Sequence, residues 1–138
     1  SMGGFVAATA APKLNPYGLI LMCPGAGMWN GCKEKADFFK NQGMTFADME
    51  GLKFGLDFNY DLATYSPFED AKGYDGKALI LRGTEDNLVD DKTCETYLEG
   101  YNGNGTFVKI PKGNHNFASI PAREACESEI LNFVESIL

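Results

Sequence analysis

Three residues that lie far apart in the chain have the side-chain types of a nucleophile, a base and an orienting acid. Ser1 begins a Ser-Met-Gly-Gly tetrapeptide, Asp86 ends a Gly-Thr-Glu-Asp sequence, and His115 is the single histidine. Serine becomes an effective nucleophile when a base removes its proton, and a buried carboxylate fixes the tautomer of that base and supports its positive charge. Glu85 competes for the acid role, and the spacing from Gly83 favours Asp86. These residue types suit acyl transfer.

Each candidate also has a plainer interpretation. A Ser-Met start can be left by expression cloning. A lone histidine is often a loop residue with a backbone partner, and Thr-Glu-Asp-Asn has the composition of a turn around Asp86. The catalytic interpretation therefore depends on whether the fold brings the three residues together in the required order.

Hydrophobic patterning predicts alternating strands and helices. Three short apolar runs predict strands over 17–23, 78–81 and 106–110, and the first is apolar on both faces, as in a parallel strand covered by helices on each side. Helices are expected over 3–11, 33–41 and 92–101, with a last one opened by Ser119 and Pro121. Pro12, together with Asn15-Pro16, is expected to end the first helix. The region 44–76 shows no regular pattern. The fold class is α/β, with a parallel sheet of about three strands flanked by helices.

The predicted topology also explains how the acid and the base would meet. Asp86 and His115 each follow a predicted strand, and open parallel sheets place their sites where strands end. Because the ends of neighbouring parallel strands lie at one edge, the two loops are expected to be adjacent.

The chain resembles the C-terminal half of an α/β-hydrolase, similar to small serine esterases of the cinnamoyl/feruloyl-esterase-like group. The matching segments are Ser1-Met2-Gly3-Gly4, Gly83-Thr84-Glu85-Asp86 with Val89, and Gly113-Asn114-His115, in the Ser, Asp, His order of that fold. The resemblance implies Ser1 as nucleophile, Asp86 as triad acid, His115 as base and the Met2 N–H as an oxyanion-hole donor. Gly3, two residues after the serine, is expected to give the first helix room against the sheet.

The resemblance assigns a lid-like role to the middle of an otherwise single α/β-hydrolase portion, residues 1–138. The insert spans about 28–75 and is rich in Phe and Tyr. Its aromatic side chains suit an apolar or aromatic acyl group, or alternatively bury a small subdomain of their own. A small-molecule carboxylic ester is the expected substrate; the substrate-binding residues are not defined.

Compared with the family, the chain is expected to lack the first half of the fold, including the loop that gives the second oxyanion donor. Loss of one such donor typically costs about 10²–10³ in rate. The 18–23 strand would then be an apolar edge, and such edges recruit other chains. We therefore expect a homo-oligomer or pairing with a complementary N-terminal half, with a non-catalytic fragment as the alternative function. A third possibility is that Ser1 is an N-terminal nucleophile that uses its own amine.

Composition excludes several other classes. The net charge of −7 argues against a nucleic-acid surface, and the longest apolar stretch is too short to span a membrane. The cysteines, Cys23, Cys32, Cys94 and Cys126, are scattered, and a single histidine offers little for a zinc site. No metal or cofactor is expected, and free buried thiols indicate a reducing, cytoplasmic compartment.

Overall fold

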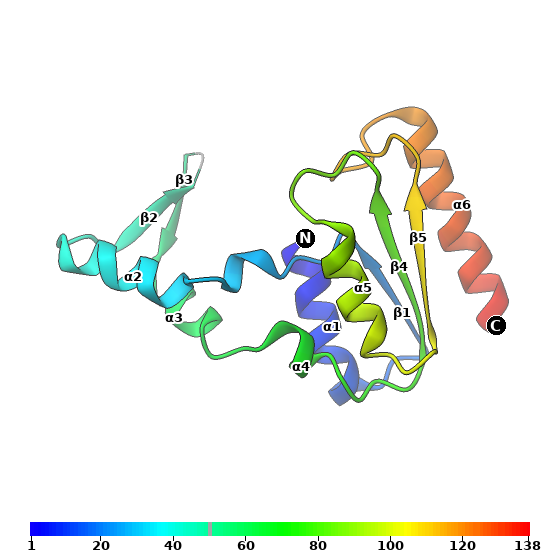
Figure 1. The fold of residues 1–138 in the computed structure, drawn as a ribbon, viewed down its shortest axis with the longest axis horizontal. Helices are drawn as coiled ribbons and strands as arrows, with labels where there is room; N and C mark the ends of the chain where they lie inside the picture. The colour runs from blue at the N-terminus through cyan, green and yellow to red at the C-terminus, as the bar shows by residue number, and fades with distance from the viewer. Residues whose placement is uncertain (50) are drawn as a thin grey trace. The chain divides into compact units, whose positions relative to one another are not determined.

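The computed structural model describes residues 1–49 and 51–138, which form two compact units (Figure 1). The first unit comprises Ser1–Ala26 and Pro67–Leu138, and the second comprises Gly27–Ser66. All residues proposed from the sequence to do chemistry lie in the first unit.

The first unit is built on a three-stranded parallel sheet with strand order β1-β4-β5. The strands are β1 (Gly18–Met22), β4 (Lys77–Gly83) and β5 (Gly105–Ile110). β4 is the central strand, and it is buried from its second residue to its end. This sheet confirms the predicted fold class.

Helices cover both faces of this sheet. Figure 1 shows α1 (Met2–Leu14) and α5 (Asp91–Glu99) on one side and α6 (Ile120–Ile137) on the other. A short helix, α4 (Pro67–Asp70), contacts α1. Asp90 and Ser119 cap α5 and α6 by accepting hydrogen bonds from the N–H groups of Thr93 and Ala122. No helix in the described part of the chain is long and apolar enough to cross a membrane.

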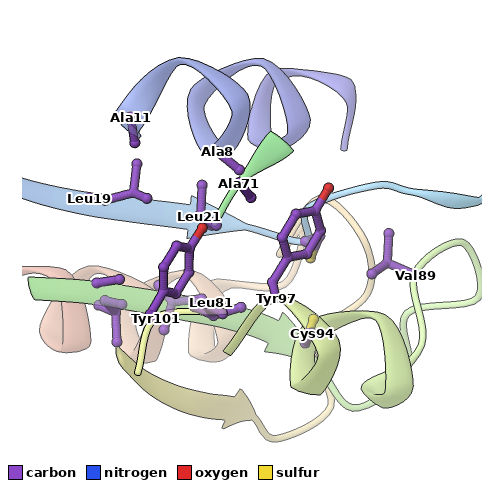
Figure 2. Packing of buried hydrophobic residues seen from close by; sticks show 14 of the residues in the cluster. Ala8, Ala11, Leu19, Leu21, Ala71, Leu81, Val89, Cys94, Tyr97 and Tyr101 are labelled. Atoms are coloured by element: carbon purple, nitrogen blue, oxygen red, sulfur yellow. The ribbon is translucent and has the colours of Figure 1, made fainter. Parts of the chain in front are cut away.

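The core lies on both faces of the sheet. Figure 2 shows the part between α1, the sheet and α5, and Ala122 and Cys126 of α6 belong to the same cluster. Ala8 and Ala11 of α1 face Leu19 and Leu21 of β1, and their small side chains allow the helix to approach the strand closely. The largest fully buried side chains include three tyrosines, Tyr74, Tyr97 and Tyr101. The four cysteines are buried and free, in agreement with the expectation from their spacing.

The first helix extends past Pro12, where the sequence predicts its end. Pro12 lies inside the helix, and the chain leaves it at Asn15, whose φ of 46° is left-handed. The Asn15 N–H donates to the Ala11 carbonyl oxygen at 2.8 Å and closes the last turn. The buried face of α1 packs against β1, so tertiary packing outweighs the loss of one backbone donor at proline.

The second unit contains the predicted helix and also regular elements after residue 44, where the sequence suggests irregular structure. It comprises a 3-10 turn η1 (Gly27–Trp29), α2 (Cys32–Asn41), the antiparallel pair β2 (Phe46–Met49) and β3 (Leu52–Gly55), and α3 (Leu56–Leu62). Tyr60 ties α3 to α2 by donating to Asp37 Oδ1 at 2.8 Å. The helix expected over 33–41 is confirmed as α2. β2, β3 and α3 have only four to seven residues each, too few for a hydrophobic period to indicate them in the sequence.

Candidate active site

Asp86 and His115 meet where β4 and β5 end, as the strand order predicts. His115 Nδ1 and Asp86 Oδ2 are 2.9 Å apart. The Asp86 side chain is fully buried, whereas 16% of the His115 side chain is exposed. When Nδ1 carries the proton and donates it to the carboxylate, Nε2 keeps a free lone pair and can accept a proton. The pair therefore has the geometry of an oriented general base.

The backbone of its own loop holds the Asp86 carboxylate in place. Asp86 Oδ1 accepts hydrogen bonds from the N–H groups of Leu88 at 2.8 Å and Val89 at 3.0 Å. Burial alone would raise the pKa of Asp86, but hydrogen bonds from His115 and these N–H groups outweigh it and lower the pKa to about 2. The residue is thus ionised near neutral pH, as an acid that supports an imidazolium must be.

Arg82, at the end of β4, fixes the loop that carries Asp86. Its Nε donates to the Val89 carbonyl oxygen at 2.6 Å and its NH2 group donates to the Asp86 carbonyl oxygen at 2.9 Å. The remaining nitrogen donates to Asp91 Oδ1 at 2.8 Å. A guanidinium group suits this position because its donors form a planar fork. The pattern that could have identified Arg82 from the sequence is a charged residue at the end of an otherwise apolar strand.

Two glycines allow the loop that carries Asp86 (the acid loop) and the loop that carries His115 (the base loop) to cross. A Cβ atom added to Gly83 would overlap the carbonyl group of Gly113, and one added to Gly113 would lie 3.1 Å from Gly83 Cα. The loops are also joined by hydrogen bonds from Glu85 N to Gly113 O at 2.9 Å and from Lys112 N to Thr84 Oγ1 at 2.8 Å. This close crossing explains how Asp86 and His115 come within hydrogen-bond distance.

The loop around His115 has its own local supports. Asn114 Oδ1 accepts hydrogen bonds from the N–H groups of Asn116 at 3.2 Å and Ala118 at 3.0 Å. Lys112 and Phe117 have left-handed φ values of 55° and 48° on either side of the histidine. Non-glycine residues in this region carry strain and are found mainly where the surrounding structure fixes them.

Ser1 is held by its backbone rather than by its side chain. The α-amino group donates to the Met22 carbonyl oxygen at 3.1 Å. The Ser1 carbonyl oxygen accepts from the N–H groups of Gly4, Phe5 and Gly25. Burial lowers the pKa of the α-amino group, while the nearby Cys23 and Asp86 act in the opposite direction. In the described part of the chain, no hydrogen bond joins Ser1 Oγ to His115.

Met2 and the glycines after it form the first turn of α1. The leading N–H groups of a helix have no intrahelical acceptor, which makes the Met2 N–H available for an anion. The expected close approach at Gly3 is wrong, because a Cβ there would meet nothing within 4 Å. The contact lies one residue later, where a Cβ on Gly4 would lie 2.8 Å from Pro24 Cα in the turn after β1.

Tyr97 of α5, the helix that follows the Asp86 loop, is linked by hydrogen bonds to Ser1. From α5, its hydroxyl donates to the Gly25 carbonyl oxygen at 3.1 Å, and the Gly25 N–H donates to the Ser1 carbonyl oxygen at 3.0 Å. Sequence reasoning places Tyr97 in a helix and gives it no role in the site. The partner is distant in sequence, so no local pattern reveals it.

Comparison with known proteins gives structural neighbours only. No family model and no curated protein matches this sequence. Among solved structures, Est1E from Butyrivibrio proteoclasticus is similar with a TM-score of 0.77 and 20% identity, covering 99% of this chain and 58% of that one. The chain has part of the α/β-hydrolase fold.

Two further structures support this assignment of the fold. Est1E with ferulic acid bound has a TM-score of 0.73 at 21% identity, over 98% of this chain and 57% of that one. A structure from work on the metagenome-derived lipolytic enzymes LipS and LipT has a TM-score of 0.72 at 16% identity, over 99% of this chain and 62% of that one. This chain spans less than two thirds of the length of each of these neighbours.

Proposed function

We propose that the protein hydrolyses carboxylic esters through an acyl-enzyme formed on Ser1. The observation that carries the proposal is the pair of Asp86 and His115, which are 2.9 Å apart at the end of two parallel strands. Ser1 supports it because its backbone is hydrogen-bonded to Met22, the last residue of β1, and to Gly25 in the turn that follows. β1 lies beside β4 in the sheet. The esterase and lipolytic neighbours add support for ester chemistry at the level of the fold.

In the proposed reaction, His115 Nε2 removes the proton of the Ser1 hydroxyl as Oγ attacks the ester carbonyl carbon. The carbonyl π electrons move to oxygen, and Asp86 stabilises the imidazolium that forms. The tetrahedral intermediate collapses, and the alcohol leaves with the proton from His115. Water then attacks the acyl-enzyme by the same steps and releases the acid.

The oxyanion needs donors aimed at the developing charge. The Met2 N–H, at the positive end of α1, is the donor that this chain offers. The second donor and the rest of the acyl pocket are proposed to come from parts of the α/β-hydrolase fold beyond the matched portion. The Phe and Tyr content of the insert, about residues 28–75, favours an apolar or aromatic acyl group, and the ferulic acid bound to Est1E makes aromatic esters the first substrates to test.

Fluorophosphonate labelling tests this proposal, because the reagent phosphonylates activated serines. We expect one label per chain, mapped by mass spectrometry to Ser1, and loss of the label in Ser1→Ala. Ser128→Ala, which changes an exposed serine of α6, is the matched control and should keep the label. Labelling of Ser128 equal to that of Ser1, or none at Ser1 in any assembly state of the chain, would reject the enzyme.

The alternative is a non-catalytic α/β-hydrolase fragment that associates through its sheet edge. Within the described residues β1 pairs only with β4, and so its other side is an edge of the sheet. Met22 is 42% exposed on this strand, and Tyr17 just before it is 74% exposed. Unpaired edges recruit further strands. Sedimentation velocity should therefore show a dimer or larger species, and a monodisperse monomer would defeat this proposal.

A further inference from the structure

Cys23 has no part in the proposed reaction, yet it lies beside Asp86 and His115. One ligand atom from each of these residues, a thiol sulfur, a carboxylate oxygen and an imidazole nitrogen, lies within 4.8 Å of the other two. The three residues follow the three parallel strands β1, β4 and β5 in turn. We propose that they form a binding site for a soft or borderline divalent cation of the Zn²⁺ or Cd²⁺ class.

The donor set decides the class of ion. Sulfur and imidazole nitrogen favour Zn²⁺ and Cd²⁺ over Mg²⁺ and Ca²⁺, which prefer oxygen ligands. Zinc ligands lie about 2.0–2.3 Å from the metal. To hold an ion, Cys23 Sγ would move toward the other two atoms, and His115 Nδ1 and Asp86 Oδ2, which are 2.9 Å apart, would separate slightly. Three protein ligands leave a fourth tetrahedral position for solvent.

The carboxylate is already oriented for such a role. Asp86 Oδ1 accepts hydrogen bonds from the N–H groups of Leu88 and Val89, and Oδ2, which lies 2.9 Å from His115 Nδ1, is the oxygen that would bind a metal. Hydrogen bonds of this kind from outside the ligand set fix the direction of metal-binding carboxylates. Arg82 adds a second support by donating to the Asp86 carbonyl oxygen at 2.9 Å.

The backbone at Cys23 gives an independent reason to assign a role to this thiol. Cys23 has a left-handed φ of 45°, although it is neither glycine nor asparagine and is fully buried. Its N–H still donates to the Leu81 carbonyl oxygen at 2.8 Å, so the strained residue continues the pairing of β1 with β4. Strained residues of this type cluster at functional sites.

Metal binding and base catalysis would use the same two side chains, Asp86 and His115, and would exclude each other. Metals bind cysteine as the thiolate, so a thiol that enters the reaction protonated must release its proton. Binding forms metal bonds to Cys23 Sγ, Asp86 Oδ2 and His115 Nδ1. One proton leaves from the thiol, while the imidazole proton moves from Nδ1 to Nε2. An Nε2 that carries a proton cannot accept one from Ser1, and the ion would act as an inhibitor.

Titration of the metal-free chain with Cd²⁺ tests the site without any need for enzymatic activity. We expect one ion per chain by equilibrium dialysis and a thiolate-to-cadmium absorption band in the ultraviolet. Cys23→Ser should abolish the band. Cys94→Ser, which changes another fully buried thiol, is the matched control and should keep it. His115→Gln should raise the Kd for Cd²⁺ by at least about tenfold, through loss of one of three ligands.

The outcomes separate this proposal from the proposed function. A band that survives Cys23→Ser, a Kd unchanged by His115→Gln, or no band at all would overturn the metal site. If Cys23→Ser fails to fold by circular dichroism, His115→Gln decides, because that side chain is partly exposed. Where Ser1 is labelled by fluorophosphonate, Cd²⁺ should slow the labelling and a chelator should restore it. A chain that binds Cd²⁺ but is never labelled would retain the metal site and lose the esterase.

Discussion

Asp86 and His115 are held by side-chain hydrogen bonds within loops that cross each other, whereas Ser1 is held through its backbone at the start of a helix. On the acid–base side, Asp86 has contacts with His115, Leu88 and Val89, and Arg82 anchors the same loop. On the serine side, the amino and carbonyl groups of Ser1 bond to the turn after β1 and to the first turn of α1. The difference shows that the orientation of His115 depends on side-chain hydrogen bonds, whereas the position of Ser1 depends on hydrogen bonds of its backbone.

The largest expected effect on stability comes from the crossing of the acid and base loops. Gly83→Ala places a Cβ against the carbonyl group of Gly113, and rigid backbone cannot move aside cheaply. We expect a loss of about 3 kcal/mol in the free energy of unfolding, measured by urea denaturation. Gly3→Ala, at a helical position with open space, is the control and should be neutral or stabilising. Equal losses in both variants would mean that the crossing has no special role.

The next effect is the dependence of stability on pH through Asp86. Its pKa is lowered to about 2 from the ordinary value of 3.8, so the folded state favours the ionised form. This contribution, about 2 kcal/mol, is fully present above pH 4 and is lost as the pH falls through about 2. Comparing urea denaturation of wild type and Asp86→Asn between pH 6 and pH 2 should show a smaller decrease in the variant. Parallel curves for the two proteins would contradict the assignment.

The smallest effect is expected at the hydrogen bond that links the two sides. Tyr97→Phe removes the donor to Gly25 and should cost about 1 kcal/mol of stability. It should also slow fluorophosphonate labelling of Ser1, because Gly25 supports the Ser1 carbonyl oxygen. The NMR signal of the His115 Nδ1 proton should stay unchanged. A shift of that signal would show that the Tyr97 hydrogen bond also affects the Asp86–His115 pair, contrary to this account.

Much of this arrangement follows from sequence patterns. The features that could not be predicted each have a physical explanation. Buried apolar runs predict β1, β4 and β5, and parallel strand ends then bring Asp86 close to His115. The Gly83–Gly113 crossing cannot be read from the sequence, because glycine is also common in ordinary turns. Gly3 and Gly4 illustrate the same limit, since neighbouring glycines have the same appearance and only Gly4 meets Pro24.

The proposed metal site shows why cysteine spacing alone is a poor guide in this fold. Scattered cysteines and a single histidine predict no metal ligands by local motif. Cys23, Asp86 and His115 come together only because three strands end at one edge of the sheet. The roles of the insert, about residues 28–75, as a lid and of β1 as an interface remain predictions of the sequence and of the sheet order.

The central claim is that Ser1, His115 and Asp86 act as one unit, and a mutant cycle on Ser1 labelling tests it most directly. The rate of fluorophosphonate labelling would be measured in wild type, His115→Ala, Asp86→Asn and the double variant, with Ser128→Ala as control. We predict that His115→Ala slows labelling by about 10²–10⁴-fold and that Asp86→Asn adds little once His115 is gone. Labelling that survives His115→Ala at the wild-type rate would contradict the triad and would favour a Ser1 activated by its own amine.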